Sequence, residues 1–197
     1  MSDQTIRLAD YTAPAWLVES VYLTFRLHPT ATEVETRVRF TPGTGGDLVL
    51  DGQALNLLSA VIDGQEVSPI LNADGLRIPV SALPEGPFEW TCTTRIDPQN
   101  NAALEGLYMS NGMYCTQCEA EGFRRITYFP DRPDVMATYT VRIESELPVL
   151  LSNGNPTASG AGWAEWHDPW PKPAYLFALV AGDLQSVTDS FTTSKNQ

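Results

Sequence analysis

The chain has 197 residues, of which 43% are hydrophobic and 18% are charged, a balance typical of a globular domain with one well-buried core. Its formal net charge of −12 argues against nucleic acid or an anionic membrane as a partner. No apolar stretch is long enough to span a bilayer, and the first residues lack the basic and apolar regions of a signal peptide. We therefore expect a cytoplasmic protein.

Alternation of apolar and polar residues predicts a succession of short strands. The clearest example is residues 16–27, where Val21, Leu23 and Phe25 share one face and polar side chains take the other. Asp63-Gly64 lies between two of the predicted strands and is a strong hairpin signal. In chain order, the predicted strands are residues 16–27, 34–40, 48–50, 57–62, 66–70, 76–80, 88–96, 137–145, 149–151 and 175–180.

Short strands separated by turn signals every eight to twelve residues or so indicate an all-β fold. We expect a β-sandwich or a saddle-like, distorted barrel. The one helical candidate is a short helix near residues 120–127. Residues 1–185 are expected to form the domain, and residues 186–197, rich in Ser and Thr, to form a tail or the start of a linker.

Cys92, Cys115 and Cys118 are an odd number of thiols, which does not suit a secreted disulfide framework. Cys115 and Cys118 form a Cys-x-x-Cys pair, a spacing found in zinc sites and redox motifs. On a strand, however, residues three apart point to opposite faces, and no second Cys pair or His pair completes four ligands. We interpret all three as buried, reduced and inert. A cysteine-dependent enzyme would need a low thiol pKa and a nearby histidine, which the sequence does not supply.

The two histidines, His28 and His167, are far apart, and neither lies in a His-Glu-x-x-His pattern. His28 is predicted to lie in a turn. His167 lies close to Trp163, Trp166 and Trp170, which favour packing but leave open a binding module that presents tryptophans to carbohydrate or protein. The sequence also lacks a nucleophile elbow and a phosphate-binding glycine loop. By its own residues, the chain is predicted not to be a catalyst.

Residues 114–134 form a long polar connection between two apolar, strand-rich regions. Their sequence includes the run Cys-Thr-Gln-Cys-Glu-Ala-Glu-Gly-Phe-Arg-Arg-Ile-Thr-Tyr-Phe-Pro-Asp-Arg-Pro-Asp. An ordinary loop would be shorter and richer in Gly, Ser and Asn, and long polar connections are often functional.

This run resembles the signature of the N-terminal domain of bacterial aminopeptidase N, a family of zinc metallopeptidases of the gluzincin type. The resemblance extends along nearly the whole chain, over residues 8–27, 48–52, 101–110, 151–156 and 168–184. In that family, zinc and the general base belong to a second domain with Gly-Ala-Met-Glu-Asn and His-Glu-x-x-His motifs, which this sequence lacks. The resemblance therefore implies an N-terminal domain that docks on a catalytic domain, binds no metal and is inactive alone.

The resemblance also implies a role for Gln117 and Glu119. They match the family's Gln-x-Glu motif, whose glutamate helps to bind the free α-amino group of a peptide substrate. An ammonium offers three donors and no acceptor, so converging carboxylates suit it. The alternative is that Glu119 is a solvated loop carboxylate. The resemblance further implies a cis peptide bond between Glu119 and Ala120, whereas Glu121, Arg124 and Arg132 are predicted to form salt bridges or interface contacts.

Overall fold

The structure, a computed structural model, describes residues 7–192. Strands make up most of this part of the chain, and the helices in it are single 3₁₀ turns. The strands are β1 (Trp16–Arg26), β2 (Thr32–Pro42), β3 (Leu48–Asp51), β4 (Asn56–Ile62), β5 (Gln65–Glu66), β6 (Ile70–Asn72), β7 (Gly75–Ile78), β8 (Phe88–Ile96), β9 (Gly106–Ser110), β10 (Met113–Gln117), β11 (Met136–Glu144), β12 (Val149–Ser152), β13 (Asn155–Gly160), β14 (Trp163–Pro173) and β15 (Leu179–Gly182). The 3₁₀ turns are η1 (Leu8–Asp10), η2 (Val80–Ala82), η3 (Phe123–Arg125) and η4 (Ala174–Leu176).

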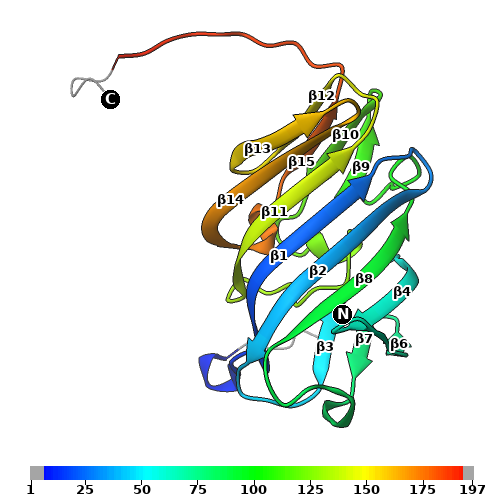
Figure 1. The fold of residues 1–197 in the computed structure, drawn as a ribbon, viewed down its shortest axis with the longest axis vertical. Coiled ribbons are helices and arrows are strands. Elements are labelled where there is room, and N and C mark those ends of the chain that lie inside the picture. The colour runs from blue at the N-terminus through cyan, green and yellow to red at the C-terminus, as the bar shows by residue number, and fades with distance from the viewer. Residues whose placement is uncertain (1–6, 193–197) are drawn as a thin grey trace.

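The strands form three sheets (Figure 1). The largest has eight strands in the order β13-β14-β11-β1-β2-β8-β4-β5, and its third and fourth strands, β11 and β1, run parallel. A four-stranded sheet has the order β12-β15-β10-β9, and a three-stranded sheet has the order β3-β7-β6. The predominance of strands confirms the all-β prediction. Over residues 7–192 no sheet closes into a barrel, so the barrel alternative is not confirmed. No helix in that range is long and apolar enough to cross a membrane.

One face of the large sheet supplies much of the core. Val21, Leu23 and Phe25 are at most 1% exposed, as their alternation in the sequence predicts. The two smaller sheets add buried side chains of their own, including Leu50 and Leu179. The bulkiest fully buried side chains are aromatic: Trp90, Tyr139, Phe25, Phe40, Phe88, Phe123 and Phe129.

The predicted helix over residues 120–127 is wrong in extent, because only η3 forms there. Arg125 N donates to Gly122 O at 3.1 Å and closes a single 3₁₀ turn. The chain then extends, since Phe129 exchanges two main-chain hydrogen bonds with Asp51 of β3. Residues 126–131 are buried in the core, and their packing there favours an extended chain over a longer helix.

The predicted strand over residues 175–180 is also displaced. The chain forms η4 first, and β15 begins only at Leu179. Asn153 causes part of this shift, because its side chain accepts from Ala178 N at 2.6 Å and donates to Leu176 O at 3.2 Å. These side-chain bonds take backbone groups that a sheet would otherwise pair. Predicted strand 66–70 is likewise split into β5 and β6, whereas the hairpin at Asp63-Gly64 is confirmed.

Candidate functional site

Strand β10 carries Gln117 to the end of the four-stranded sheet, where it pairs with Gly106 of β9. The two strands form a hairpin across Asn111 and Gly112, whose φ angles are 49° and 79°. Both residues therefore have the positive φ of a type I′ turn, for which Asn-Gly is the preferred pair. The sequence prediction omitted this hairpin, although Asn-Gly was the signal that could have found it.

A tight turn follows Gln117. Cys118, which is 2% exposed, fixes its start, and Gly122 N donates to Cys118 O at 2.8 Å to close it. A Cβ atom on Gly122 would lie 2.3 Å from Gln117 O, so only glycine fits without a shift of the backbone. Between these two anchors, residues 119–121 are exposed.

The other side of the turn is anchored through η3. The Phe123 ring is fully buried and packs edge-on against Phe129 and Phe177, with ring centroids 5.1 and 5.2 Å apart. Ile126 O accepts a hydrogen bond from Thr94 Oγ1 of the large sheet at 2.9 Å. The exposed turn therefore stands on a rigid base, which suits a side chain that must be aimed.

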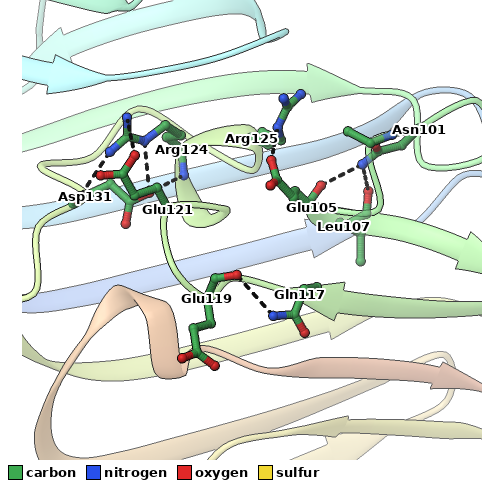
Figure 2. Close-up of polar contacts among 10 residues, drawn as sticks. Asn101, Glu105, Leu107, Gln117, Glu119, Glu121, Arg124, Arg125 and Asp131 are labelled. Carbon is green, nitrogen blue, oxygen red and sulfur yellow. Dashed lines mark hydrogen bonds and ion pairs between the residues drawn. The ribbon is translucent and has the colours of Figure 1, made fainter. Parts of the chain in front are cut away.

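Arg124 and Asp131 form the main polar contact behind the turn (Figure 2). Asp131 Oδ2 accepts from Arg124 N at 3.0 Å and from Arg124 Nε at 3.2 Å, and Asp131 O accepts from Arg124 Nη2 at 3.2 Å. Arg124 Nη1 also lies 3.4 Å from Glu121 Oε2. The Asp131 side chain is 2% exposed, so this is a buried ion pair with an exposed second carboxylate. Arg124 thus makes the predicted salt bridge.

Burial raises the pKa of Asp131 above its ordinary value. The hydrogen bonds and the charge of Arg124 act in the opposite direction, and the nearby Asp51 carboxylate raises the pKa further. Asp51 Oδ2 accepts from Asp131 N at 2.9 Å, which ties this pair to strand β3. The ionised form of Asp131 is therefore disfavoured by desolvation and depends on Arg124.

Glu119 differs from the carboxylates around it. Over residues 7–192 its carboxylate makes no hydrogen bond and no ion pair, and the side chain is exposed and points away from the Arg124 cluster (Figure 2). By contrast, Glu121 and Asp131 pair with Arg124, and Asp134 pairs with Arg132 at 2.6 Å. Of the carboxylates in residues 114–134, Glu119, the residue predicted to bind substrate, is therefore the one whose oxygens are available to accept hydrogen bonds from a ligand.

Gln117 lies beside Glu119. Its Nε2 atom donates to the main-chain oxygen of Glu119 at 3.1 Å, which leaves the Gln117 Oε1 atom free to act as an acceptor. The peptide bond between Glu119 and Ala120 is cis, as the resemblance implied. The structure thus brings the two predicted residues together on one turn. Neither lines the cavity of about 670 Å³ that Arg124 and Asp131 border, and both are exposed.

An apolar surface extends from Gln117 across the four-stranded sheet. Opposed residues of neighbouring strands share a face, so the register places one set of side chains on the side away from the core. We call this set the apolar face: Tyr108, Met113, Cys115, Val149, Leu151 and Val180. All six side chains are half-buried or exposed. The sequence analysis missed this face, because it did not predict β9 and β10.

The cysteine prediction holds for two of the three thiols. Cys92 and Cys118 are buried, and burial raises the pKa of Cys92 to about 11. Burial and the Asp131 charge also raise the pKa of Cys118. Cys115 is only half-buried, contrary to the prediction, because strand alternation places it on the apolar face. High thiol pKa values argue against a cysteine nucleophile at the two buried positions.

The tryptophans do not form a shared platform. The Arg142 guanidinium lies over Trp163, with its Cζ atom 3.9 Å from the centre of the Trp163 ring. Trp166, by contrast, packs against the core and donates to Leu150 O. Trp170 is 76% exposed and lies beyond them on β14. Alternation along β14 separates Trp163 from Trp166, since residues three apart face opposite ways.

Neither histidine joins a site. His28 lies in the turn between β1 and β2, as predicted, and its Nδ1 atom accepts from Thr30 N at 3.3 Å. His167 Nδ1 lies 2.9 Å from Thr140 Oγ1 on the outer face of the large sheet. Among residues 7–192, no three His, Cys, Asp or Glu side chains are placed to hold a metal ion. The side chains in this range therefore do not fit a zinc site.

Comparison with known proteins identifies the family to which the chain is related. Residues 85–176 match the family model described as Peptidase M1 N-terminal domain. Aminopeptidase N of Caulobacter vibrioides is 52% identical to the chain over 200 residues, covering 96% of this chain and 23% of that protein. The chain carries a peptidase M1 N-terminal domain. Aminopeptidase N of Escherichia coli is 43% identical over 194 residues, covering 93% of this chain and 22% of that protein.

Solved structures of M1 peptidases share the fold. Aminopeptidase A of Legionella pneumophila, solved in complex with aspartic acid, is 34% identical with a TM-score of 0.86 and covers 98% of this chain and 24% of its own. An M1 zinc metallopeptidase from Deinococcus radiodurans is 18% identical with a TM-score of 0.73, covers 86% of this chain and 43% of its own, and shows the fold alone. The chain thus spans less than a quarter of the curated aminopeptidases N that it matches.

Proposed function

We propose that this M1 N-terminal domain serves a zinc-dependent aminopeptidase by binding the free α-amino group of a peptide substrate through Glu119 and Gln117. The observation that carries the proposal is the exposed carboxylate of Glu119, which is unpaired within residues 7–192, whereas the neighbouring carboxylates Glu121, Asp131 and Asp134 are paired with arginines. An exposed carboxylate on a rigidly anchored turn is available to accept from an ammonium. Gln117 Oε1, at the end of β10 directly before the turn, supplies a second acceptor.

An open surface cannot by itself enclose an ammonium or exclude water. We therefore propose that a catalytic domain, encoded in the same longer protein, docks on the apolar face and supplies the second wall of the site. Support comes from the continuity of that face with Gln117 on β10 and from the short span of the chain relative to its aminopeptidase relatives. Interdomain faces of this kind typically bury roughly 600–1,500 Å².

The zinc and the residues that activate it belong, in this proposal, to that catalytic domain. Zinc would supply a Lewis acid and an activated water for peptide hydrolysis. The present chain binds and orients the amino end of the substrate, so that the first peptide bond lies at the metal. Fixing the amino end at one distance from the metal makes the enzyme remove single N-terminal residues.

We also propose a cytoplasmic location. The three cysteines are unpaired, which suits a reducing compartment. Fractionation of cells that produce the tagged, full-length protein tests this, and recovery in the periplasmic or secreted fraction would contradict it.

Substitution of Glu119 in the full-length protein tests the main proposal. We expect Glu119→Ala to lower kcat/KM for an alanyl anilide roughly 30- to 150-fold, mainly through a higher KM, because a charge-assisted partner of the amine is lost. Zinc content is expected to stay unchanged. Glu66→Ala, at an exposed glutamate on β5, is the matched control and is expected to behave as wild type. An unchanged kcat/KM in Glu119→Ala would contradict the proposal and show that Glu119 is only a solvated loop carboxylate.

A further inference from the structure

We infer that Arg124 is a positioning residue for the α-amino site: by pairing with Glu121 and Asp131, it aims the Glu119 turn and keeps Glu121 from competing for the ammonium. This inference rests on the proposed function and extends it to a residue that does not touch the substrate. The argument has two independent parts, one on the backbone and one on charge.

The backbone argument starts from the connections of Arg124. Its N atom and its Nε atom both donate to the Asp131 carboxylate, and its O atom accepts from Gln53 N at 2.9 Å. Arg124 thus links η3 to two other segments, the chain after β3 and the segment that leads into β11. Its main chain is held on both sides, two residues beyond the point where Gly122 closes the Glu119 turn.

The side-chain bonds extend this hold into the turn itself. Arg124 Nη1 contacts Glu121, which is exposed and lies two residues from Glu119. A planar guanidinium can satisfy Asp131 on one edge and Glu121 on another, and a lysine cannot reproduce that geometry. The turn is therefore closed by the hydrogen bond between Gly122 and Cys118, and the ion pair with Arg124 adds a contact at Glu121.

The charge argument concerns which carboxylate is available. Glu119 and Glu121 are both exposed on one short turn, and either could attract an ammonium. Arg124 engages Glu121, so only Glu119 of this pair is left unpaired within residues 7–192. If Arg124 were absent, Glu121 would become a second acceptor at a different position, and the buried Asp131 would lose its counter-charge.

Arg125 provides a matched control from the same 3₁₀ turn. Its side chain is 20% exposed, compared with 22% for Arg124, and it also forms an ion pair, with Glu105 at 3.0 Å. Glu105, however, precedes β9 and lies on the other side of η3 from the Asp131 contact (Figure 2). Arg125→Met therefore removes an arginine and an ion pair without changing the partners of Glu121.

The test is a double-substitution cycle in the full-length protein, with kcat/KM for an alanyl anilide as the readout. The variants are Arg124→Met, Glu119→Ala and the combination, and a parallel cycle replaces Arg124→Met by Arg125→Met. We expect Arg124→Met to raise KM about tenfold with little change in zinc content, and to shrink the effect of Glu119→Ala by about fivefold or more. In the Arg125→Met cycle the two effects are expected to multiply.

A merely structural role would give multiplicative effects in both cycles, and that result would overturn the inference while leaving the proposed function intact. An unchanged kcat/KM in Glu119→Ala alone would overturn the proposed function and this inference with it. If Arg124→Met fails to fold, Arg124→Lys decides, because it keeps a counter-charge near Asp131 but loses the forked geometry. In the Arg124→Lys background we also expect Glu119→Ala to lower kcat/KM less than it does in wild type, although the difference should be smaller than with Arg124→Met. If the two effects on kcat/KM simply multiply in that cycle, the inference is overturned.

Discussion

The polar residues behind the Glu119 turn differ in how much they depend on their partners. Asp131 is almost fully buried, and three of its hydrogen bonds come from a single residue, Arg124. Glu121 and Glu119 are exposed, and water can solvate them whatever their neighbours do. Changes of pH should therefore affect stability through Asp131 more than through the two glutamates.

Asp131 should make a pH-dependent contribution of a definite sign. Its pKa in the folded state is raised above the ordinary value of 3.8, so the protonated form is favoured in the folded chain. Its contribution to stability is then largest below pH 3.8 and falls as the pH rises through the folded-state pKa. We expect the stability of wild type relative to Asp131→Asn to decline over that window, measured by urea unfolding at a series of pH values.

The control for this series is Asp134→Asn. Arg132 lowers the pKa of Asp134, so the opposite trend is expected, with wild type gaining relative to the variant as the pH rises towards 3.8. A flat profile for Asp131→Asn would mean that Arg124 fully offsets the desolvation of this carboxylate.

At the scale of elements, the Glu119 turn depends on a close approach of two backbone segments. Gly122 lies against Gln117 O and Cys118 Cα, with hypothetical Cβ distances of 2.3 and 2.9 Å. Both neighbours are backbone atoms, which cannot rotate away as a flexible side chain could.

We expect Gly122→Ala to destabilise the chain by about 1–3 kcal/mol, because the added methyl group forces the turn away from β10. In the full-length enzyme the same variant should raise KM, since Glu119 moves with the turn. Gly86→Ala is the control, because nothing lies within 4 Å of a Cβ atom there and its φ is not positive. Thermal unfolding of both variants measures the difference, and equal stabilities would show that the turn yields easily.

For the whole molecule, the apolar face sets how the domain behaves alone. Its six members lie on the side of the four-stranded sheet away from the core, and all of them are half-buried or exposed. Contiguous apolar surface of this kind favours association between copies when its proper partner is missing. The same surface would be buried if a catalytic domain docks there.

We expect the isolated chain to self-associate at high concentration and to bind the dye ANS. Leu151→Lys, at a side chain 40% exposed on β12, should reduce both effects while leaving the circular dichroism spectrum unchanged. Val49→Lys is the control, because Val49 is also an exposed aliphatic residue on a strand but lies on β3, outside the apolar face. It should change neither self-association nor ANS binding. Sedimentation at several concentrations measures association, and a strictly monomeric, ANS-silent wild type would contradict the docking proposal.

Local patterns in the sequence were enough for much of the strand content. The alternation at Val21, Leu23 and Phe25 reports burial directly, because side chains on a strand alternate between core and solvent. The Asp63-Gly64 hairpin follows from turn chemistry in the same local way. Where prediction failed, as at residues 120–127 and 175–180, contacts distant in sequence had determined the backbone: Phe129 paired with Asp51, and Asn153 held residues 176–178.

The sequence by itself determined the all-β class and, through its resemblance to bacterial aminopeptidase N, singled out Gln117 and Glu119. These depend on local alternation and on a specific run of residues. Only the tertiary structure decided that, among the described residues, Glu119 is unpaired while Glu121 and Asp131 are not, because ion pairing depends on where Arg124 is placed in space. The apolar face was decided in the same way, since it exists only when β9, β10, β12 and β15 are brought into register.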